Sequence, residues 1–346
     1  MASYLYASTL LCANKLGKKP AYLFDTHKVL PYFSVFSEDR LRLSQLYQYI
    51  EQQLEDCLEQ AQWSLQEMNK IPIFLGSTGY VITDCEARYC EDKSLPNPHR
   101  LTHISDYLAQ KYQTQVFNFA TSCTSSAQAI YYASKMLKQN NCQRAIVIGF
   151  ESFNRLTFEH FHAMGLLAES FDYQPFNCQQ EGIILGEGIA CIALSQQPNP
   201  QFRCELLAEQ SLTDNGSLTN INTQFLGELL QNICHIGGIE KAQLNAIKVH
   251  GVGGISDQTE LEVLQQYYPN IPLLLAKPQL GHCLGASGAM ETAWLLQALQ
   301  QKQKISMLKN SQNLTALETR LANGYYLTYF LGFGGSNLGW LLDWED

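Results

Sequence analysis

The sequence contains no run of 18 or more apolar residues, the length that a membrane-spanning helix needs. The short apolar run near its N-terminus has no positively charged segment before it, so no secretory signal peptide is expected. Basic residues are scarce, because 23 lysines and arginines are outnumbered by 32 acidic residues, for a net charge of −9. This balance argues against general nucleic-acid binding, which needs a basic surface. We expect a cytoplasmic protein.

Paired cysteines are also missing. The eleven cysteines are odd in number and include no Cys-x-x-Cys spacing, which argues against a disulfide framework or a zinc site. The segment His160-Phe161-His162 has no carboxylate or cysteine partner at ligand spacing. We therefore expect no metal and no permanently bound cofactor.

Alternating apolar strands and amphipathic helices indicate an α/β fold. With 346 residues, of which 46% are hydrophobic, the chain is long enough for two domains. Proline and polar residues at 197–200 interrupt the pattern after a predicted strand at 189–194. The sequence thus predicts an N-terminal half, 1–198, and a C-terminal half, 199–346.

One cysteine stands between a strand pattern and a helix pattern. Cys123 lies in Thr-Ser-Cys-Thr-Ser-Ser at 121–126, after the apolar run 116–120 and before a helical repeat that starts at Ala127. The N–H groups and dipole of a helix N-terminus stabilise a thiolate, so we predict a lowered pKa and a nucleophilic Cys123. The alternative is a buried structural thiol, because free cysteine behaves as a small hydrophobe.

Two histidines have similar placements. His250 follows the strand-like run 246–249 and precedes Gly-Val-Gly-Gly, which is too rich in glycine to continue a strand. His282 lies in the glycine-rich segment 277–288, which begins with Lys277, between a predicted strand at 272–276 and a predicted helix at 289–299. A lone histidine is more often structural than catalytic. Three such placements, of one cysteine and two histidines, together favour a catalytic site.

In order along the chain, these motifs produce a family resemblance. The Cys123 segment is followed by Gly-Ile-Ile-Leu-Gly-Glu-Gly at 182–188, the His250 loop, the segment 277–288 and Gly-Phe-Gly-Gly-Ser-Asn at 332–337. Together they resemble the β-ketoacyl-acyl carrier protein synthases over about residues 73–346. The resemblance implies a thiolase-like fold of two similar halves in five layers, αβαβα, with the site between the halves.

The resemblance also implies a reaction, the decarboxylative Claisen condensation of acyl and malonyl thioesters carried on the phosphopantetheine arm of acyl carrier protein. Cys123 would hold the acyl group in a covalent intermediate. His250 and His282 would polarise the malonyl thioester carbonyl while carbon dioxide leaves.

Supporting roles follow from the same resemblance. Lys277 would supply positive charge beside His282, and Glu291 would anchor the network. The N–H groups of Cys123 and Phe333 would form an oxyanion hole, with the Phe333 side chain gating the acyl pocket. Other thiolase-fold enzymes normally pair one histidine with an asparagine or a second cysteine, so the two histidines speak against that alternative.

Several positions depart from the family pattern. Val252 and Gly254 replace two threonines that hydrogen-bond the pantetheine arm, and losing two such bonds, worth about 0.5–1.5 kcal/mol each, weakens arm binding by roughly one to two powers of ten. Asn177 and Gln180 replace an aspartate and an arginine, and Tyr-Phe-Leu at 329–331 replaces a smaller, more polar Asn-Ser-Phe.

The N-terminal 70 residues match the family poorly, and the chain is shorter than usual before Cys123. A strand-like segment at 4–7 and a polar loop with Lys15, Lys18 and Lys19 precede a helix predicted from Glu38 to about Met68. Its apolar stripe predicts a core-facing helix, with a docking or membrane helix as the alternative.

These departures suggest a division of labour. Some polyketide and aryl-polyene systems pair a catalytic ketosynthase subunit with a related chain-length factor that shapes the product pocket. We expect a condensing subunit that works in a heterodimer, with a weakly active or inactive chain-length factor or a homodimer as alternatives.

Docking of the acidic carrier protein would use basic residues of this chain or of the partner. The candidates on this chain are Lys15, Lys18, Lys19, Arg40, Arg42, Lys135 and Lys138. The alternative interpretation is that these residues are only solvated surface charges.

Overall fold

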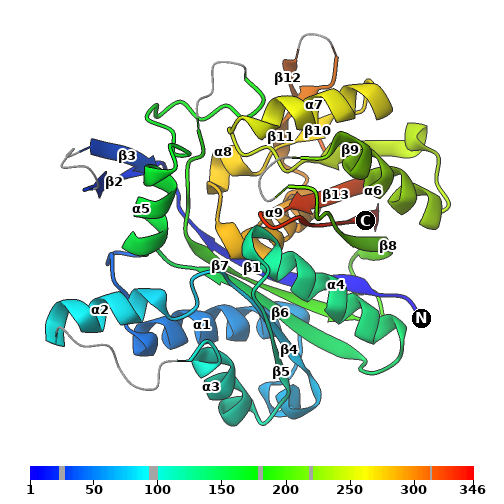
Figure 1. Ribbon diagram of the computed structural model, residues 1–346. Coiled ribbons are helices and arrows are strands. Elements are labelled where there is room, and N and C mark those ends of the chain that lie inside the picture. The colour runs from blue at the N-terminus through cyan, green and yellow to red at the C-terminus, as the bar shows by residue number, and fades with distance from the viewer. Residues whose placement is uncertain (23–27, 93–99, 178–181, 218–220, 312–313) are drawn as a thin grey trace.

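The computed structural model describes residues 1–22, 28–92, 100–177, 182–217, 221–311 and 314–346 (Figure 1). Its strands are β1 (Tyr4–Cys12), β2 (Gly17–Ala21), β3 (Lys28–Tyr32), β4 (Ile73–Gly76), β5 (Val116–Phe119), β6 (Arg144–Glu151), β7 (Gly188–Ser195), β8 (Arg203–Thr213), β9 (Leu244–Lys248), β10 (Leu273–Leu274), β11 (Lys304–Lys309), β12 (Thr315–Arg320), β13 (Gly324–Leu331) and β14 (Ser336–Glu345).

Helices alternate with these strands along the chain. The α-helices are α1 (Leu43–Ala61), α2 (Ile82–Asp92), α3 (His103–Tyr112), α4 (Ser125–Lys138), α5 (Arg155–Ala163), α6 (Thr223–Ile236), α7 (Ser256–Tyr267), α8 (Lys277–Leu280) and α9 (Ser287–Gln301). Short 3-10 turns are η2 (Leu65–Lys70), η3 (Ser122–Thr124), η4 (Lys241–Gln243) and η5 (Leu284–Ala286). The α/β class predicted from the sequence is confirmed.

The strands of the two halves form one mixed sheet with a narrow seam. The strand order is β12-β11-β10-β9-β13-β14-β8-β1-β7-β6-β4-β5. At the seam, β8 and β1 share the single pair Tyr4↔Glu205, whereas β8 and β14 are paired along most of their lengths. The first half thus contributes β1 and β4–β7, and the second half contributes β8–β14.

Two buried helices fill the space between the halves. Helix α4 packs on β4 and β6, α9 packs on β1 and β7, and the two helices pack on each other (Figure 1). Gly288 permits this approach, because a Cβ there would lie 2.2 Å from the backbone nitrogen of Ala127. The outer faces are covered by α1 and α3 on the first half and by α6 and α7 on the second.

The long N-terminal helix is shorter than predicted. Helix α1 begins at Leu43, after the extended Arg42, and ends where Gln62 adopts a left-handed conformation with φ of 55°. Leu65 belongs to the separate turn η2 and is 49% exposed. The predicted core-facing stripe is confirmed, because Leu46, Ile50 and Leu54 are fully buried.

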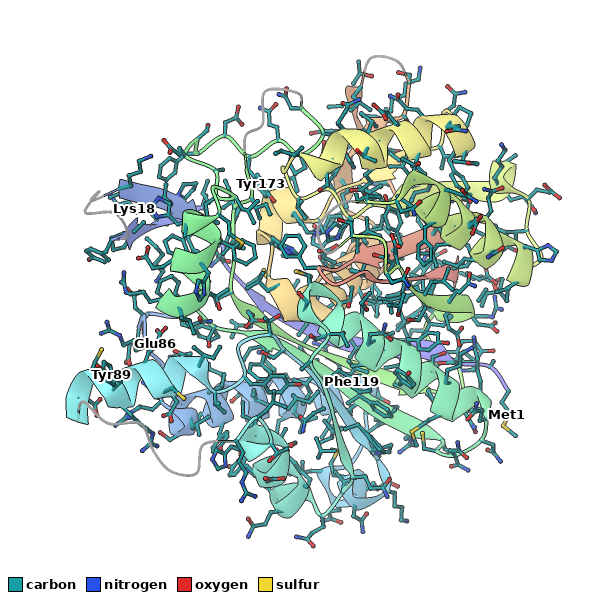
Figure 2. The ribbon with its side chains drawn as sticks, viewed as in Figure 1. Met1, Lys18, Glu86, Tyr89, Phe119 and Tyr173 are labelled. Carbon is teal, nitrogen blue, oxygen red and sulfur yellow. The ribbon has the colours of Figure 1, made fainter. Side chains whose placement is uncertain are left out.

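The predicted polar loop near the N-terminus is also different in the structure. Lys18 and Lys19 lie in β2, which pairs with β3 in a small hairpin at the periphery (Figure 2). The Lys19 side chain is buried, forms an ion pair with Asp39 and lies over the Phe153 ring. It is therefore no exposed docking cation.

Two other candidate docking cations share one acidic partner. Lys135 and Lys138 both pair with the buried carboxylate of Glu209. Their charge is thus partly compensated within this chain.

Candidate active site

Cys123 lies in a tight turn between β5 and α4, as the sequence predicts. Ser122 adopts the left-handed conformation, with φ of 57°, a conformation that is uncommon outside glycine. Neighbouring hydroxyls hold this turn: the Ser125 hydroxyl donates to the Ser122 carbonyl at 2.7 Å, and the Thr124 hydroxyl donates to the Thr121 carbonyl at 2.7 Å. The hydroxyl-rich sequence therefore fixes the direction in which the thiol projects.

The predicted activation of Cys123 by a lowered pKa is wrong. Burial raises the pKa of the Cys123 thiol, and the opposing effects of the Ser122 hydroxyl, the Phe333 N–H and Lys277 are smaller. The thiol lies among apolar side chains of distant segments, including Phe161 and Ile183. Desolvation disfavours a thiolate there, so the resting thiol keeps its proton and needs a base.

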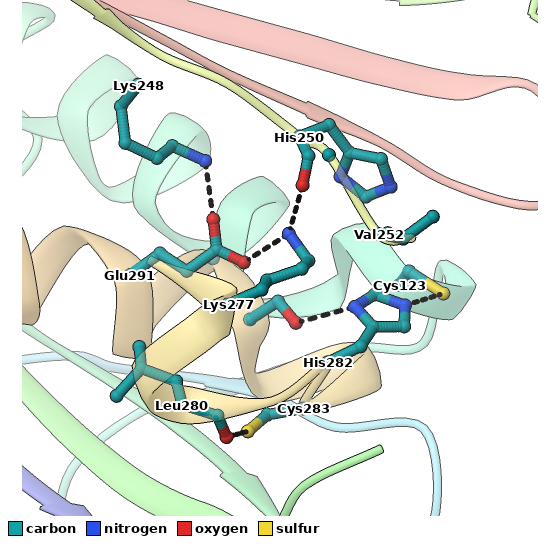
Figure 3. A network of polar contacts seen from close by, with 12 residues as sticks. Cys123, Lys248, His250, Val252, Lys277, Leu280, His282, Cys283 and Glu291 are labelled. Atoms are coloured by element: carbon teal, nitrogen blue, oxygen red, sulfur yellow. Dashed lines mark hydrogen bonds and ion pairs between the residues drawn. The ribbon is translucent and has the colours of Figure 1, made fainter. Parts of the chain in front are cut away.

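His282 is the base within reach. Its Nε2 lies 3.3 Å from the Cys123 sulfur, and its Nδ1 lies 3.4 Å from the Ser287 hydroxyl (Figure 3). Burial and then the charge of Lys277 lower the pKa of His282 well below its usual value. A neutral imidazole has one acceptor nitrogen, so His282 can take the thiol proton at Nε2 while Nδ1–H donates to Ser287.

His250 follows β9 by two residues and is held by its backbone. Glu260 accepts hydrogen bonds from the backbone N–H groups of His250 and Gly251 at 2.8 and 3.0 Å. Asp257 accepts the next two, from Val252 and Gly253, both at 2.9 Å. These two carboxylates of α7 shape the glycine-rich loop, a role that we did not predict.

The His250 ring is oriented by β13. The Leu331 N–H donates to Nδ1 at 3.5 Å, so a neutral ring carries its proton on Nε2. The two histidine rings are nearly perpendicular, with centroids 5.7 Å apart. Burial, followed by the charges of Lys277, His282 and Lys248, lowers the pKa of His250 well below its usual value. His250 is therefore poised as a neutral hydrogen-bond donor.

A buried charge network lies behind the two histidines and holds the backbone of His250 (Figure 3). Lys277 donates to the His250 carbonyl at 2.6 Å and to Glu291 Oε1 at 2.7 Å. Lys248 donates to Glu291 Oε2 at 2.6 Å, and burial lowers the pKa of Lys248 to about 8. The predicted pair Lys277 and Glu291 is thus close to the site but behind it, and Lys248 is an unpredicted third member.

A cavity of about 350 Å³ opens onto the reactive groups. Cys123, His250 and His282 line it, together with Val252 and Gly254 of the altered loop. The residues that continue this wall are Phe161, Met164, Leu166, Ile183, Asp214, Phe225, Ile255, Leu331 and Phe333. The structure therefore brings together the predicted nucleophile, both histidines and the loop around one mostly apolar space.

Phe333 also lies at this cavity. Its ring stacks on Phe161, with centroids 6.2 Å apart and planes 14° apart. Of the other departures, Asn177 is exposed, and Gln180 lies outside the described residues. Tyr329 is fully buried and contacts Glu260.

Other kinds of site find no support in the parts of the chain that the structure describes. No group of three or more histidine, cysteine or acidic side chains there is arranged to hold a metal. The ten cysteines within these ranges are free thiols. No helix in them has both the length and the apolarity to cross a membrane.

Comparison with known sequences gives a consistent match. The model of the beta-ketoacyl synthase N-terminal domain matches residues 12–199, and that of the C-terminal domain matches residues 206–310. The non-reducing polyketide synthase Preu3 of Preussia isomera is 24% identical over 242 residues, covering 64% of this chain and 9% of that protein. A putative mitochondrial 3-oxoacyl-[acyl-carrier-protein] synthase of Schizosaccharomyces pombe is 22% identical over 271 residues, covering 67% of this chain and 62% of that protein.

Solved structures share the fold. The ketosynthase ApeO in complex with its chain length factor ApeC, from Xenorhabdus doucetiae, matches with a TM-score of 0.81 and 20% identity, covering 99% of this chain and 98% of that one. The ishigamide ketosynthase/chain length factor matches with a TM-score of 0.79 and 16% identity, covering 99% and 98%. The chain therefore belongs to the β-ketoacyl synthase family and has its thiolase-like α/β fold.

Proposed function

We propose that this chain is a condensing subunit that joins acyl and malonyl thioesters carried by acyl carrier protein. One observation carries the proposal: Cys123, His250 and His282 line one cavity, and His282 Nε2 lies 3.3 Å from the cysteine sulfur. This arrangement contains a nucleophile, its base and a separate hydrogen-bond donor.

In the first half-reaction, Cys123 takes the acyl group. His282 accepts the thiol proton, the sulfur attacks the acyl thioester carbonyl, and the carbon–sulfur bond to the phosphopantetheine arm breaks. The arm leaves as a thiol after receiving the proton. The N–H groups of Cys123 and Phe333 would stabilise the oxyanion, which is worth about 3–4 kcal/mol for one such donor in enzymes where it has been removed.

In the second half-reaction, the malonyl thioester loses carbon dioxide. The electron pair of the broken carbon–carbon bond passes into an enolate whose oxygen accepts hydrogen bonds from His250 and His282. The nucleophilic carbon then attacks the acyl-cysteine carbonyl, the carbon–sulfur bond breaks, and the Cys123 thiolate leaves and takes up a proton from water. The neutral state of His250 suits this role, because the Leu331 N–H at Nδ1 leaves its own proton on Nε2. His282 donates from Nε2 in its other neutral tautomer, in which Nδ1 accepts a hydrogen bond from the Ser287 hydroxyl.

A second ketosynthase-like subunit is the partner that we propose for this chain. Strand β5 is an edge of the sheet, and an exposed edge presents unpaired backbone groups. Phe117 of β5 and Tyr132 of the neighbouring helix α4 are 37% and 50% exposed, and Phe119 of β5, labelled in Figure 2, stacks on Tyr132. The fold match to ApeO, solved in complex with its chain length factor, supports a related partner.

Intact-mass measurement tests the catalytic part of the proposal. The chain would be incubated with an acyl-carrier thioester, alone and with its partner subunit, and Cys123→Ala would serve as the control. We expect the mass of one acyl group on the natural chain and none on the variant. An active, stable homodimer would overturn the heterodimer part alone.

A chain-length factor is the second candidate function. The raised pKa of Cys123 and the missing hydroxyls at Val252 and Gly254 favour it. In that case labelling and elongation would occur on the partner, and this chain would stay unmodified while remaining necessary for product length.

A further inference from the structure

The contacts of Lys248 connect two strands and one helix behind His250. Lys248 lies two residues before His250 on β9, and its side chain is fully buried. Besides Glu291, its ammonium group donates to the Tyr329 carbonyl at 3.0 Å and lies 3.6 Å from the centre of the Phe330 ring. Lys248 therefore ties β9 to both β13 and α9.

Tyr329 continues this connection toward the histidine. Its hydroxyl donates to Glu260, the same carboxylate that accepts the N–H groups of His250 and Gly251. Two residues further along β13, Leu331 donates its N–H to the His250 ring. The position of β13 thus affects both the backbone and the ring of His250.

The residues that replace the smaller family pattern at 329 and 330 are the ones that Lys248 contacts. A tyrosine at 329 supplies the hydroxyl for Glu260, and a phenylalanine at 330 supplies an aromatic face for the ammonium group of Lys248. A cation over an aromatic ring is stabilised when both are removed from water. The larger side chains at 329 and 330 therefore make contacts with Glu260 and Lys248 that the smaller residues would not make.

We propose that Lys248 and Tyr329 are positioning residues that hold His250 with its Nε2–H directed into the cavity. Lys248 fixes the Tyr329 carbonyl and hence the strand segment that ends in the Leu331 N–H. The Tyr329 hydroxyl completes the hydrogen bonding of Glu260, which fixes the His250 backbone. Neither residue contacts the cysteine, so the two residues position His250 and do not affect Cys123.

Nuclear magnetic resonance of the histidine rings tests the positioning directly. Tyr329→Phe removes one hydroxyl and keeps the ring, and Lys248→Met removes the ammonium group at similar length. In the natural chain we expect His250 as the Nε2–H tautomer, assigned by its loss in His250→Gln. In both variants we expect a mixture of tautomers or a shifted Nδ1 signal. An unchanged His250 spectrum in folded Tyr329→Phe would overturn the proposal.

Tyr326→Phe is a matched control. Tyr326 lies on the same strand and is also buried, but its hydroxyl bonds to the backbone of Ala322, away from the cavity. The Tyr326→Phe substitution removes an equivalent hydroxyl and leaves the contacts of Glu260 unchanged. We expect no change in the His250 spectrum, and a change equal to that of Tyr329→Phe would show a general effect of strand β13 and contradict the specific role.

The kinetic consequence rests on the proposed function. Acylation of Cys123 should be unchanged in Tyr329→Phe, whereas decarboxylation of a malonyl thioester should fall about tenfold in kcat with little change in KM, because His250 would no longer be held with its Nε2–H directed at the enolate oxygen. Equal loss of both steps would contradict the inference. If the natural chain shows neither step but the His250 spectrum still changes, the proposed function fails and the positioning role stands.

Discussion

The two halves place their reactive side chains just before a helix but surround them differently. In the first half, β5 and the turn η3, which contains Cys123, lead into α4; in the second half, His282 follows the short helix α8 and is followed by η5 and α9. Hydroxyl groups hold the first turn. A buried network of Lys248, Lys277 and Glu291 lies behind the histidines of the second half (Figure 3). In the proposed reaction, one half thus supplies the nucleophile, and the other supplies its base and the buried charges.

The largest expected effect comes from removing the contact between His282 and Cys123, which joins the two halves at the site. His282→Ala removes the base beside Cys123, and because the buried thiol keeps its proton, acylation should slow by about 100-fold or more. His250→Ala should leave acylation nearly intact and abolish malonyl decarboxylation. Stopped-flow or quenched intact-mass kinetics of both steps would check this, and equal effects of the two variants on acylation would contradict the division.

The buried charges of the second half should matter for stability. Glu291→Ala leaves the two lysines without their shared carboxylate, and breaking a buried ion pair costs about 3–5 kcal/mol. Denaturant unfolding would measure this loss. Glu169→Gln is the control, because the pair of Glu169 with Lys28 lies on the surface, where we expect no measurable change. Similar results for both variants would show that the network is not needed for stability.

Restoring the loop hydroxyls would sharpen the comparison with the family. The double variant Val252→Thr/Gly254→Thr offers two donors to a pantetheine arm, and a Cβ at Gly254 has ordinary contact distances of 3.6 Å or more. We expect the KM for carrier thioester to fall about tenfold with kcat little changed. Steady-state kinetics would show it, and an unchanged KM would mean that the arm does not pass this loop.

The smallest effect is a pH dependence in the first half. Glu151 accepts the N–H groups of Thr78, Gly79 and Gly285, and burial raises its pKa to about 7. A raised folded-state pKa favours the folded state while the carboxyl is protonated, so this contribution is lost as pH rises through 7. From pH 6.5 to 8 it should cost about 1 kcal/mol of unfolding free energy.

Glu151→Gln isolates that contribution. Both histidines have pKa values lowered well below the usual range, so they are neutral in the folded state throughout this window. The natural chain should lose stability relative to the variant between pH 6.5 and 8, as measured by chemical denaturation. Parallel curves for the two proteins would contradict the raised pKa.

Local sequence patterns were enough to predict which side chains meet at the cavity. Cys123, His250 and His282 each follow a strand pattern and adjoin glycine or hydroxyl residues, and the structure brings all three to one cavity. The predicted partners Lys277 and Glu291 are also in contact. These features depend on neighbours in the sequence or on a shared order of motifs.

The remaining features depend on contacts between distant segments. Lys248 is a charged residue in an apolar strand, and this position indicates a buried charge that needs a partner. Its partners on α9 and β13 could not be deduced from sequence spacing. The direction of the Cys123 pKa shift was wrong because apolar side chains from other parts of the chain bury the thiol. Likewise, α1 ends at Ala61 because Gln62 turns left-handed, although the apolar stripe continues past it.

The central claim is that Cys123 of this chain is a working nucleophile. Its most direct test is the intact mass of the chain after incubation with an acyl-carrier thioester in the presence of the partner subunit. Our account predicts one added acyl group on the natural chain and none on Cys123→Ala. An unmodified chain beside an acylated partner would contradict the account and leave this chain the role of a chain-length factor.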